Sequence, residues 1–158
     1  MSAEQNRTDH PGYRAVHLER LATKQYRATN ADGASLEFGQ GEGLLTPVEL
    51  LLAAVAGCSA VDVDVVTSRR SEPEVFEAVS SALKITEDDA VRLEDVEVSF
   101  TVKFPQDAAG KQAQKMIDRL LKLSHDKDCT VSRTIEHPTN VTLKESECEP
   151  DVTQAVTE

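Results

Sequence analysis

The chain has 158 residues, of which 39% are hydrophobic and 28% are charged, and it contains no tryptophan. This length fits one domain whose core is large enough to fold without a disulfide or a metal. The composition excludes the collagen-like and disulfide-scaffold classes. The formal net charge of −11 argues against a nucleic-acid partner, because a phosphate backbone would be repelled.

The two ends of the chain differ from its middle. The start lacks the basic and apolar segments of a secretory signal, so the cytoplasm is the expected location. No apolar run approaches the ~18–20 residues of a membrane span, and no membrane partner is expected. From Glu145 onward the chain has five acidic residues and no basic one. We expect a loose N-terminus over 1–11, a single domain over 12–145 and a disordered acidic tail over 146–158.

A β-hairpin signal opens the predicted domain. Residues 13–29 read as a weak strand region, whose end alternates polar and apolar side chains. The same alternation resumes at Leu36 and Phe38. Between them, the segment Asn30–Gly33 supplies residues that tolerate positive φ, which favours a tight turn.

The strongest helix start follows a glycine-rich link. Thr46 suits the N-cap, Pro47 suits the first turn, and Glu49 has the spacing of a capping box. The stretch from Leu50 to Ala60 is apolar on all sides, so a buried helix over 47–69 is predicted. One chain has too few strands to cover such a helix. A homodimer in which two copies of it pack together is therefore expected.

The remaining elements complete an α+β pattern with an antiparallel sheet. We predict strands over 75–86 and 95–104, a helix over 108–125 and a last strand over 135–143. In the second of these strands every other residue is apolar, which predicts one core face and one wet face. These apolar residues are Val96, Val98, Phe100, Val102 and Phe104.

Three cysteines carry the candidate chemistry. Cys58 is central in the apolar helix among small neighbours, and Cys129 stands between Lys127 and Arg133, whose charges could favour a thiolate. A low-pKa thiolate with a resolving cysteine nearby is what a thiol peroxidase needs. The alternative for Cys58 is a small core residue, and spacing alone does not show that the two cysteines meet. Cys148, in the acidic tail, is interpreted as incidental.

Other site types have weaker support. His125 and Cys129 are four residues apart, a spacing that could bind zinc on a helix face, but no close second pair of ligands follows. The repeat of Gly39, Gly41 and Gly43 lacks the Lys and the Ser or Thr of a phosphate-binding loop. We therefore expect neither a metal nor a cofactor.

Two motifs carry a family resemblance. The segment Thr46–Cys58 resembles the first-cysteine helix of the OsmC/Ohr family of osmotically inducible and organic hydroperoxide resistance proteins. The segment Cys129–Ser132 is similar to the second motif of that family, usually Cys-Pro-Val-Ser. The likeness extends over about 23–144, and the Pro-x-Glu-Leu-Leu-Leu-Ala-Ala pattern resembles a less-studied OsmC-like branch.

The resemblance implies an intertwined homodimer, in which antiparallel sheets wrap the central helices, and thiol-dependent reduction of organic hydroperoxides in oxidative-stress defence. By this analogy Cys58 attacks the peroxide and becomes a sulfenic acid, Cys129 closes a disulfide, and an external dithiol reduces it. The alternative function is a non-catalytic dimeric module of the same fold that binds a small apolar ligand or acts as a redox sensor.

The chain departs from the family pattern at the start of the helix. Well-characterised members have Asn-Pro-Glu there, and that Glu holds an Arg beside the reactive thiolate. Here Val48 stands in its place, and the nearest acid is Glu49, which also fits the capping box. Lys24 and Arg27 are the candidate cations of the first hairpin, and the sequence does not choose between them. Thr130 replaces the usual Pro.

Overall fold

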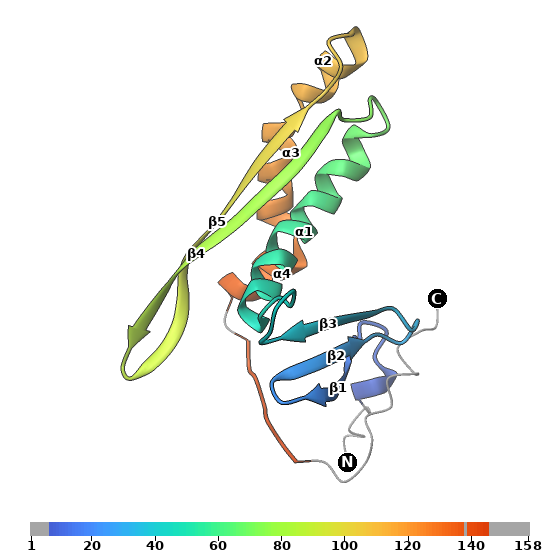
Figure 1. Ribbon diagram of the computed structural model, residues 1–158. Helices are drawn as coiled ribbons and strands as arrows, with labels where there is room; N and C mark the ends of the chain where they lie inside the picture. Colours follow the sequence, from blue (N-terminus) through green and yellow to red (C-terminus); the bar gives the residue numbers. More distant parts are fainter. Residues whose placement is uncertain (1–6, 138, 146–158) are drawn as a thin grey trace, which may run out of the picture. The chain divides into compact units, whose positions relative to one another are not determined.

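The computed structural model describes residues 7–137 and 139–145 (Figure 1). It contains two compact units, one formed by Met1–Pro47 with Thr142–Glu158 and the other by Val48–Val141. The expected tail over 146–158 lies outside the described residues, as do residues 1–6 of the expected loose N-terminus. The single-domain boundaries drawn from the sequence stay a prediction.

The first unit holds a three-stranded antiparallel sheet of β1 (His17–Ala22), β2 (Gln25–Thr29) and β3 (Ser35–Gly39), after a 3-10 turn at Arg7–Asp9. The predicted hairpin is confirmed, because β2 pairs with β3 in regular register. In its turn Gly33 has a φ of 84°, and the Asn30 side chain accepts a hydrogen bond from the Ala34 N–H at 2.9 Å.

The two faces of this sheet differ. On one face the rings of Tyr26 and Phe38 lie 6.0 Å apart. On the other, the Arg27 guanidinium binds the carboxylates of Glu19 at 3.3 Å and Glu37 at 2.7 Å. At the end of β3, Gly39 has a φ of 140°, and any Cβ there would collide with the backbone of the β1–β2 turn. Only glycine fits that position.

Helix α1 (Pro47–Thr67) begins where the capping signals place it. Only Val55, Val63 and Thr67 along it are buried. This agrees with the expectation that one chain has too few elements to cover the helix, while its burial in a homodimer stays a prediction. Val61 and Val65 are 66% and 54% exposed. Within its own unit, the other elements cover only one side of α1.

A second feature of α1 is its apolar length. The helix has 21 residues and is, by length and composition, long and apolar enough to cross a membrane. The core helix of a soluble protein passes the same test. Here Val63 is fully buried in the core, and the carboxylate of Asp62 accepts a hydrogen bond from the Ser124 hydroxyl. Both residues tie α1 to the rest of its unit.

Two long strands form the second sheet, β4 (Val75–Glu87) and β5 (Ala90–Lys103), paired antiparallel. Both predicted strands are confirmed, and β5 starts five residues earlier than its prediction. A register shift lies between Ser81 and Leu83, and opposite it Asp95 has a φ of 51°. This bulge changes the alternation, so the apolar positions of β5 are odd-numbered before it and even-numbered after it.

The core face of β5 is largely as predicted. Phe104, just beyond β5, is 3% exposed, and the exposure of Val96 rises to 37% near the bulge. Between them Val98, Phe100 and Val102 are half-buried, whereas Ser99, Thr101 and Lys103 are exposed. On β4 the apolar residues Val79 and Leu83 lie exposed, because Val79 pairs with Ser99 on the outer face. The inner face of β4 is formed instead by the partners of the β5 core residues, Phe76, Ala78 and Ser80.

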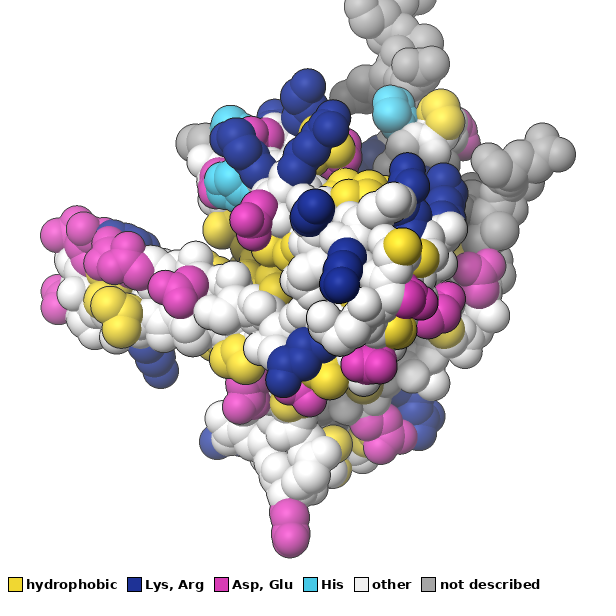
Figure 2. Space-filling model, turned by 90° about the horizontal axis from the view of Figure 1, so that it is seen from above, with side chains coloured by type: hydrophobic (Ala, Val, Ile, Leu, Met, Phe, Trp, Pro, Cys, Tyr) yellow, Lys and Arg dark blue, Asp and Glu magenta, His cyan; other side chains and the backbone are white. Residues whose placement is uncertain are grey.

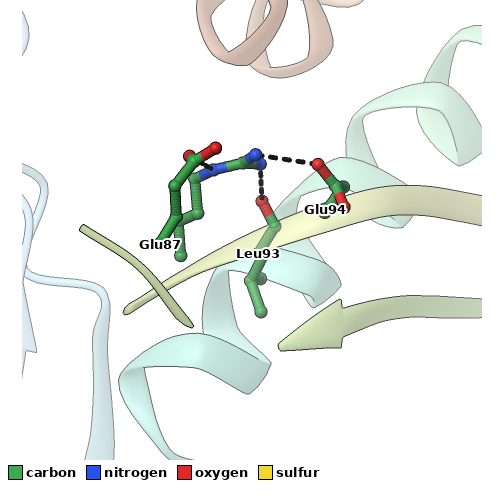
Figure 3. Close-up of polar contacts among 4 residues, drawn as sticks. Glu87, Leu93 and Glu94 are labelled. Atoms are coloured by element: carbon green, nitrogen blue, oxygen red, sulfur yellow. Dashed lines mark hydrogen bonds and ion pairs between the residues drawn. The ribbon is translucent and has the colours of Figure 1, made fainter. Parts of the chain in front are cut away.

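Acidic side chains gather at the tip of the β4–β5 hairpin (Figure 2). Asp88 and Asp89 in the turn have φ values of 50° and 61°. Next to them the Arg92 guanidinium binds Glu87 at 2.9 Å and Glu94 at 2.8 Å, and it donates to the Leu93 carbonyl (Figure 3). Arg92 thus offsets part of the negative charge at the tip.

The C-terminal part of the second unit is a chain of short helices. They are α2 (Ala108–Gln114), α3 (Ile117–Leu123), the π-helical turn η2 (Ser124–Asp128) and α4 (Thr130–Glu136). The predicted single helix over 108–125 is therefore broken after Gln114. The core cluster joins α1, the end of β5, α2 and α3 through Val63, Phe104, Ala113 and Ile117.

The predicted last strand over 135–143 is wrong. Ile135 belongs to α4, and residues 139–145 have no regular secondary structure. The helix forms because the Cys129 side chain caps it by accepting a hydrogen bond from the Ser132 N–H. Beyond it, Val141 and Leu143 are 82% and 92% exposed, and among the described strands none pairs with them.

Candidate active site

The structure brings the two predicted cysteines together. Cys58 is half-buried on α1, and Cys129 is fully buried at the N-cap of α4. The two side chains lie close enough for each to shift the pKa of the other. The η2 turn directs the chain so that Cys129 has extended backbone angles, and its sulfur lies 3.1 Å from the Ser132 hydroxyl and 3.4 Å from the Ser132 nitrogen.

The surroundings of the two thiols favour different protonation states. Burial raises the pKa of Cys58, and a backbone hydrogen bond from Val131 lowers it. The interaction with Cys129 and the charge of Asp62 add to the effect of burial, so the pKa of Cys58 is raised. Burial also favours the neutral form of Cys129, but hydrogen bonds from Ser132, Cys58 and Ser59 outweigh it and lower the pKa of Cys129. Of the two thiols, Cys129 is therefore the one whose surroundings favour the thiolate.

The source of this asymmetry differs from the expectation that Lys127 and Arg133 favour a thiolate. The groups that lower the pKa of Cys129 are hydrogen-bond donors. The Arg133 guanidinium instead donates to the carbonyl of Asp126 at 2.9 Å. Lys127 and Arg133 line a separate hollow with His137 and three threonines.

A hydrogen bond between Asp62 and Ser124 connects the two elements that carry the thiols. Ser124 is 1% exposed, and its hydroxyl donates to the Asp62 carboxylate at 2.7 Å. This bond joins α1, one turn beyond Cys58, to the η2 turn that leads to Cys129. Sequence reasoning missed both residues. The signal that could have found Asp62 is a carboxylate four residues after a cysteine in an otherwise apolar helix.

A pocket of about 280 Å³ lies beside the thiols. Ser59, the neighbour of Cys58, and Ser132, the partner of Cys129, are both in its wall. His125 and Glu136 also line it, 3.7 Å apart at Nε2 and Oε1. The rest of the wall is apolar and comes from four elements: Val55, Val96, Val98, Phe100, Leu121 and Ile135. Such a pocket suits a ligand with an apolar body.

The other candidate residues have surroundings of their own. Arg27 is bound by Glu19 and Glu37 of its own sheet, and Lys24 lies in the turn between β1 and β2 with a φ of 61°. Cys148 is outside the described residues. For zinc, the described part of the chain offers no group of three or more His, Cys, Asp and Glu side chains that could hold a metal ion.

Comparison with known proteins identifies the fold. Among solved structures, an OsmC-like protein of unknown function from Vibrio cholerae has a TM-score of 0.63 at 12% identity, over 79% of this chain and 94% of that one. A hypothetical protein from Aquifex aeolicus has a TM-score of 0.59 at 23% identity, over 78% and 87%. An OsmC-like protein from Mycoplasma pneumoniae has a TM-score of 0.57 at 11% identity, over 78% and 87%. No curated protein matches the sequence.

The family comparison covers the site itself. The model described as OsmC-like protein matches residues 39–144, which include α1, both long strands and α4. Both cysteines of the pair lie inside this match. This chain belongs to the OsmC-like protein family.

Proposed function

We propose that this protein is a cytoplasmic thiol peroxidase that reduces organic hydroperoxides in oxidative-stress defence. The observation that carries the proposal is that the Cys58 and Cys129 side chains lie close enough to shift each other's pKa, beside an apolar pocket. Two thiols this close can form a disulfide after one of them is oxidised. The family resemblance of the two cysteine motifs supports the same chemistry.

Exposure assigns the two roles. Cys129 is fully buried, whereas Cys58 is half-buried, so a peroxide reaches the sulfur of Cys58 more readily. Cys58 attacks the terminal oxygen of the hydroperoxide, the O–O bond breaks, and the alcohol leaves. The Cys129 thiolate then attacks the sulfenic sulfur of Cys58 and displaces hydroxide, which takes a proton to form water. An external dithiol reduces the disulfide by thiol exchange.

The pocket supports an organic substrate. Apolar side chains of α1, β5, α3 and α4 surround the space beside the thiols. Burial of an alkyl or aryl group against them contributes about 25 cal/mol for each Å² removed from water. Hydrogen peroxide has no such group, so it gains none of this binding energy.

A second copy of the chain completes the proposed assembly. α1 exposes apolar side chains on the side that its own unit leaves open: Val48, Leu51, Val61 and Val65. A homodimer that packs two such faces together removes them from water, and the resemblance to the family implies the same arrangement.

Peroxide consumption with dithiothreitol as reductant tests the function. We expect faster consumption of cumene and tert-butyl hydroperoxide than of hydrogen peroxide. Cys58→Ser abolishes turnover, because an alcohol is a poor nucleophile at neutral pH. Cys148→Ser is the matched control and changes little. Mass spectrometry that finds Cys58 unmodified after peroxide, or a disulfide to Cys148, contradicts the proposal.

The alternative is a binding module or redox sensor, and the surroundings of Cys58 favour it. A raised pKa makes Cys58 less reactive at rest, whereas ligand binding needs only the pocket. A chain that leaves peroxide unconsumed but binds the fluorescent apolar probe ANS, in competition with cumyl alcohol, supports this second function.

A further inference from the structure

Cys129 holds the start of α4 as well as belonging to the thiol pair. It is the N-cap residue of this helix, and its sulfur accepts a hydrogen bond from the Ser132 N–H at 3.4 Å. The Ser132 hydroxyl lies 3.1 Å from the same sulfur. A side chain that binds a free N–H of the first turn stabilises a helix. In α4 the group that does so is a thiol, and the bonding of a thiol changes when it is oxidised.

α4 gains little stability from burial. It has seven residues, and none of them is buried. Its side chains contact the neighbouring η2 turn, where the Arg133 guanidinium donates to the Asp126 carbonyl at 2.9 Å and Glu136 lies 3.7 Å from His125. A helix this short is marginal without apolar packing. The cap at its N-terminus therefore contributes a large part of its local stability.

The same helix borders the pocket beside the thiols. It contributes Ser132, Ile135 and Glu136 to the pocket wall, and its cap residue Cys129 is fully buried. An external dithiol must reach a sulfur of a disulfide in order to attack it. Because Cys129 is fully buried, the structure with α4 in place keeps such a reductant away from this sulfur.

We propose that Cys129 is a redox-responsive helix cap: its disulfide with Cys58 weakens the cap, loosens α4 and gives an external dithiol access to the disulfide. This inference deepens the proposed function and rests on it, because the proposed cycle supplies the disulfide. In a disulfide the Cys129 sulfur has neither a charge nor a proton, so it accepts only weakly from Ser132 and donates nothing. The first turn of α4 then lacks its side-chain partner.

The cap opens and closes once in each catalytic cycle. The organic hydroperoxide takes two electrons from the thiol pair, and closure of the disulfide loosens α4. A thiolate of the external dithiol then attacks the Cys129 sulfur, the S–S bond breaks, and Cys58 leaves as a thiolate. The second thiol of the reductant attacks the mixed disulfide, releases Cys129 as a thiolate and closes the disulfide of the reductant. The free Cys129 sulfur caps α4 again, and the pocket wall re-forms.

Amide hydrogen exchange followed by NMR tests the cap, in a Cys148→Ser background that leaves two thiols. Diamide forms the disulfide, so this measurement needs no peroxide turnover, and mass spectrometry identifies the bond between Cys58 and Cys129. Loss of an N-cap bond corresponds to about fivefold faster exchange. We expect this acceleration in the disulfide form for the amides of residues 133–136 of α4, and unchanged exchange in α2. Unchanged or slower exchange in α4 overturns the inference.

Two substitutions of Cys129 separate the cap from the disulfide. Cys129→Ser keeps a side-chain acceptor, since serine is among the preferred N-cap residues, whereas Cys129→Ala removes it. Neither variant can form the disulfide, so a difference between them reports the cap alone. We expect α4 to exchange as slowly in Cys129→Ser as in the reduced parent, and about fivefold faster in Cys129→Ala. Equal exchange of α4 in the two variants overturns the capping role.

The rate of disulfide reduction tests whether α4 controls access. Thr134 is exposed in α4 and is not part of the pocket wall beside the thiols. Dithiothreitol should reduce the disulfide about fivefold faster in Thr134→Gly than in Thr134→Ala, because glycine favours a helix less than alanine. Lys111→Gly and Lys111→Ala, at an exposed position of α2, are the matched pair and should not differ. Equal reduction rates in the two Thr134 variants overturn the inference.

Failure of the function and failure of the cap response give different results. If cumene hydroperoxide leaves both thiols unoxidised while the diamide disulfide loosens α4, the peroxidase function is wrong and the cap response is correct. If the peroxide forms the disulfide but α4 exchanges as in the reduced protein, only the redox-responsive cap is wrong. If neither oxidant joins Cys58 to Cys129, both proposals are wrong.

Discussion

Asp62→Asn separates the electrostatic role of this residue from its structural one. The Asp62 carboxylate accepts the buried Ser124 hydroxyl at 2.7 Å, and its charge raises the pKa of Cys58. Asn keeps an acceptor oxygen for Ser124 but removes the charge. The pKa of Cys58 should therefore fall toward its ordinary value, and Cys58 should react faster at neutral pH.

The cost in stability follows from the hydrogen bond. A bond to a charged acceptor contributes about 1.5–3 kcal/mol, and a neutral one about 0.5–1.5 kcal/mol. Because Ser124 keeps a neutral partner in Asp62→Asn, the variant should lose about 1 kcal/mol. For a domain of this size, that lowers the melting temperature by about 2–4 °C.

The assay is the rate of Cys58 alkylation by iodoacetamide across pH, in a Cys129→Ser, Cys148→Ser background that leaves one thiol. Asp64→Asn is the matched control, since Asp64 is exposed on the same helix and accepts from the Ser68 hydroxyl at 2.8 Å. If both variants leave the alkylation profile of Cys58 unchanged, the charge of Asp62 does not control this thiol.

Three further predictions test the core, the assembly and the start of α1. Phe104→Ala should cost about 3–5 kcal/mol in denaturant unfolding because it empties the centre of the core, whereas Thr101→Ala on the exposed face should stay within about 0.5 kcal/mol. Val61→Asp should dissociate the homodimer in sedimentation, and a compact monomer of the unaltered chain at micromolar concentration refutes the dimer. Glu49→Gln should cost about 1 kcal/mol if Glu49 only caps the helix; a much larger loss of peroxide rate indicates that it replaces the family's Arg-holding acid.

Local signals predicted the elements that local chemistry determines. Pro47 and its flanking residues placed the start of α1, and the alternation up to Phe104 placed the inner face of β5. The C-terminal helices were harder, because α4 depends on one cap at Cys129 and carries few apolar residues. Ile135 fits a short helix as well as a strand, so periodicity could not distinguish them.

The site needed tertiary information. The motifs pointed to Cys58 and Cys129, but these residues are 71 residues apart in sequence number, and only the fold brings them together. The bond between Asp62 and Ser124 has the same long-range character, at a separation of 62 residues. The pKa shifts of Cys58 and Cys129 could not be predicted from the sequence either, because they depend on burial and on which hydrogen-bond donors reach Cys129.

The pocket yields a last prediction, on substrate size. Val96 lines the pocket and is 37% exposed, so a larger side chain there fills pocket space without overpacking the core. Val96→Phe should raise the KM for cumene hydroperoxide about tenfold, a typical effect of altering one apolar contact, and affect tert-butyl hydroperoxide less. Val91→Phe is the control, because Val91 is 58% exposed on the same strand and is not part of the pocket wall. This pocket does not bind the organic part of the peroxide if Val91→Phe changes the KM as much as Val96→Phe does. The same conclusion follows if Val96→Phe raises the KM equally for both hydroperoxides.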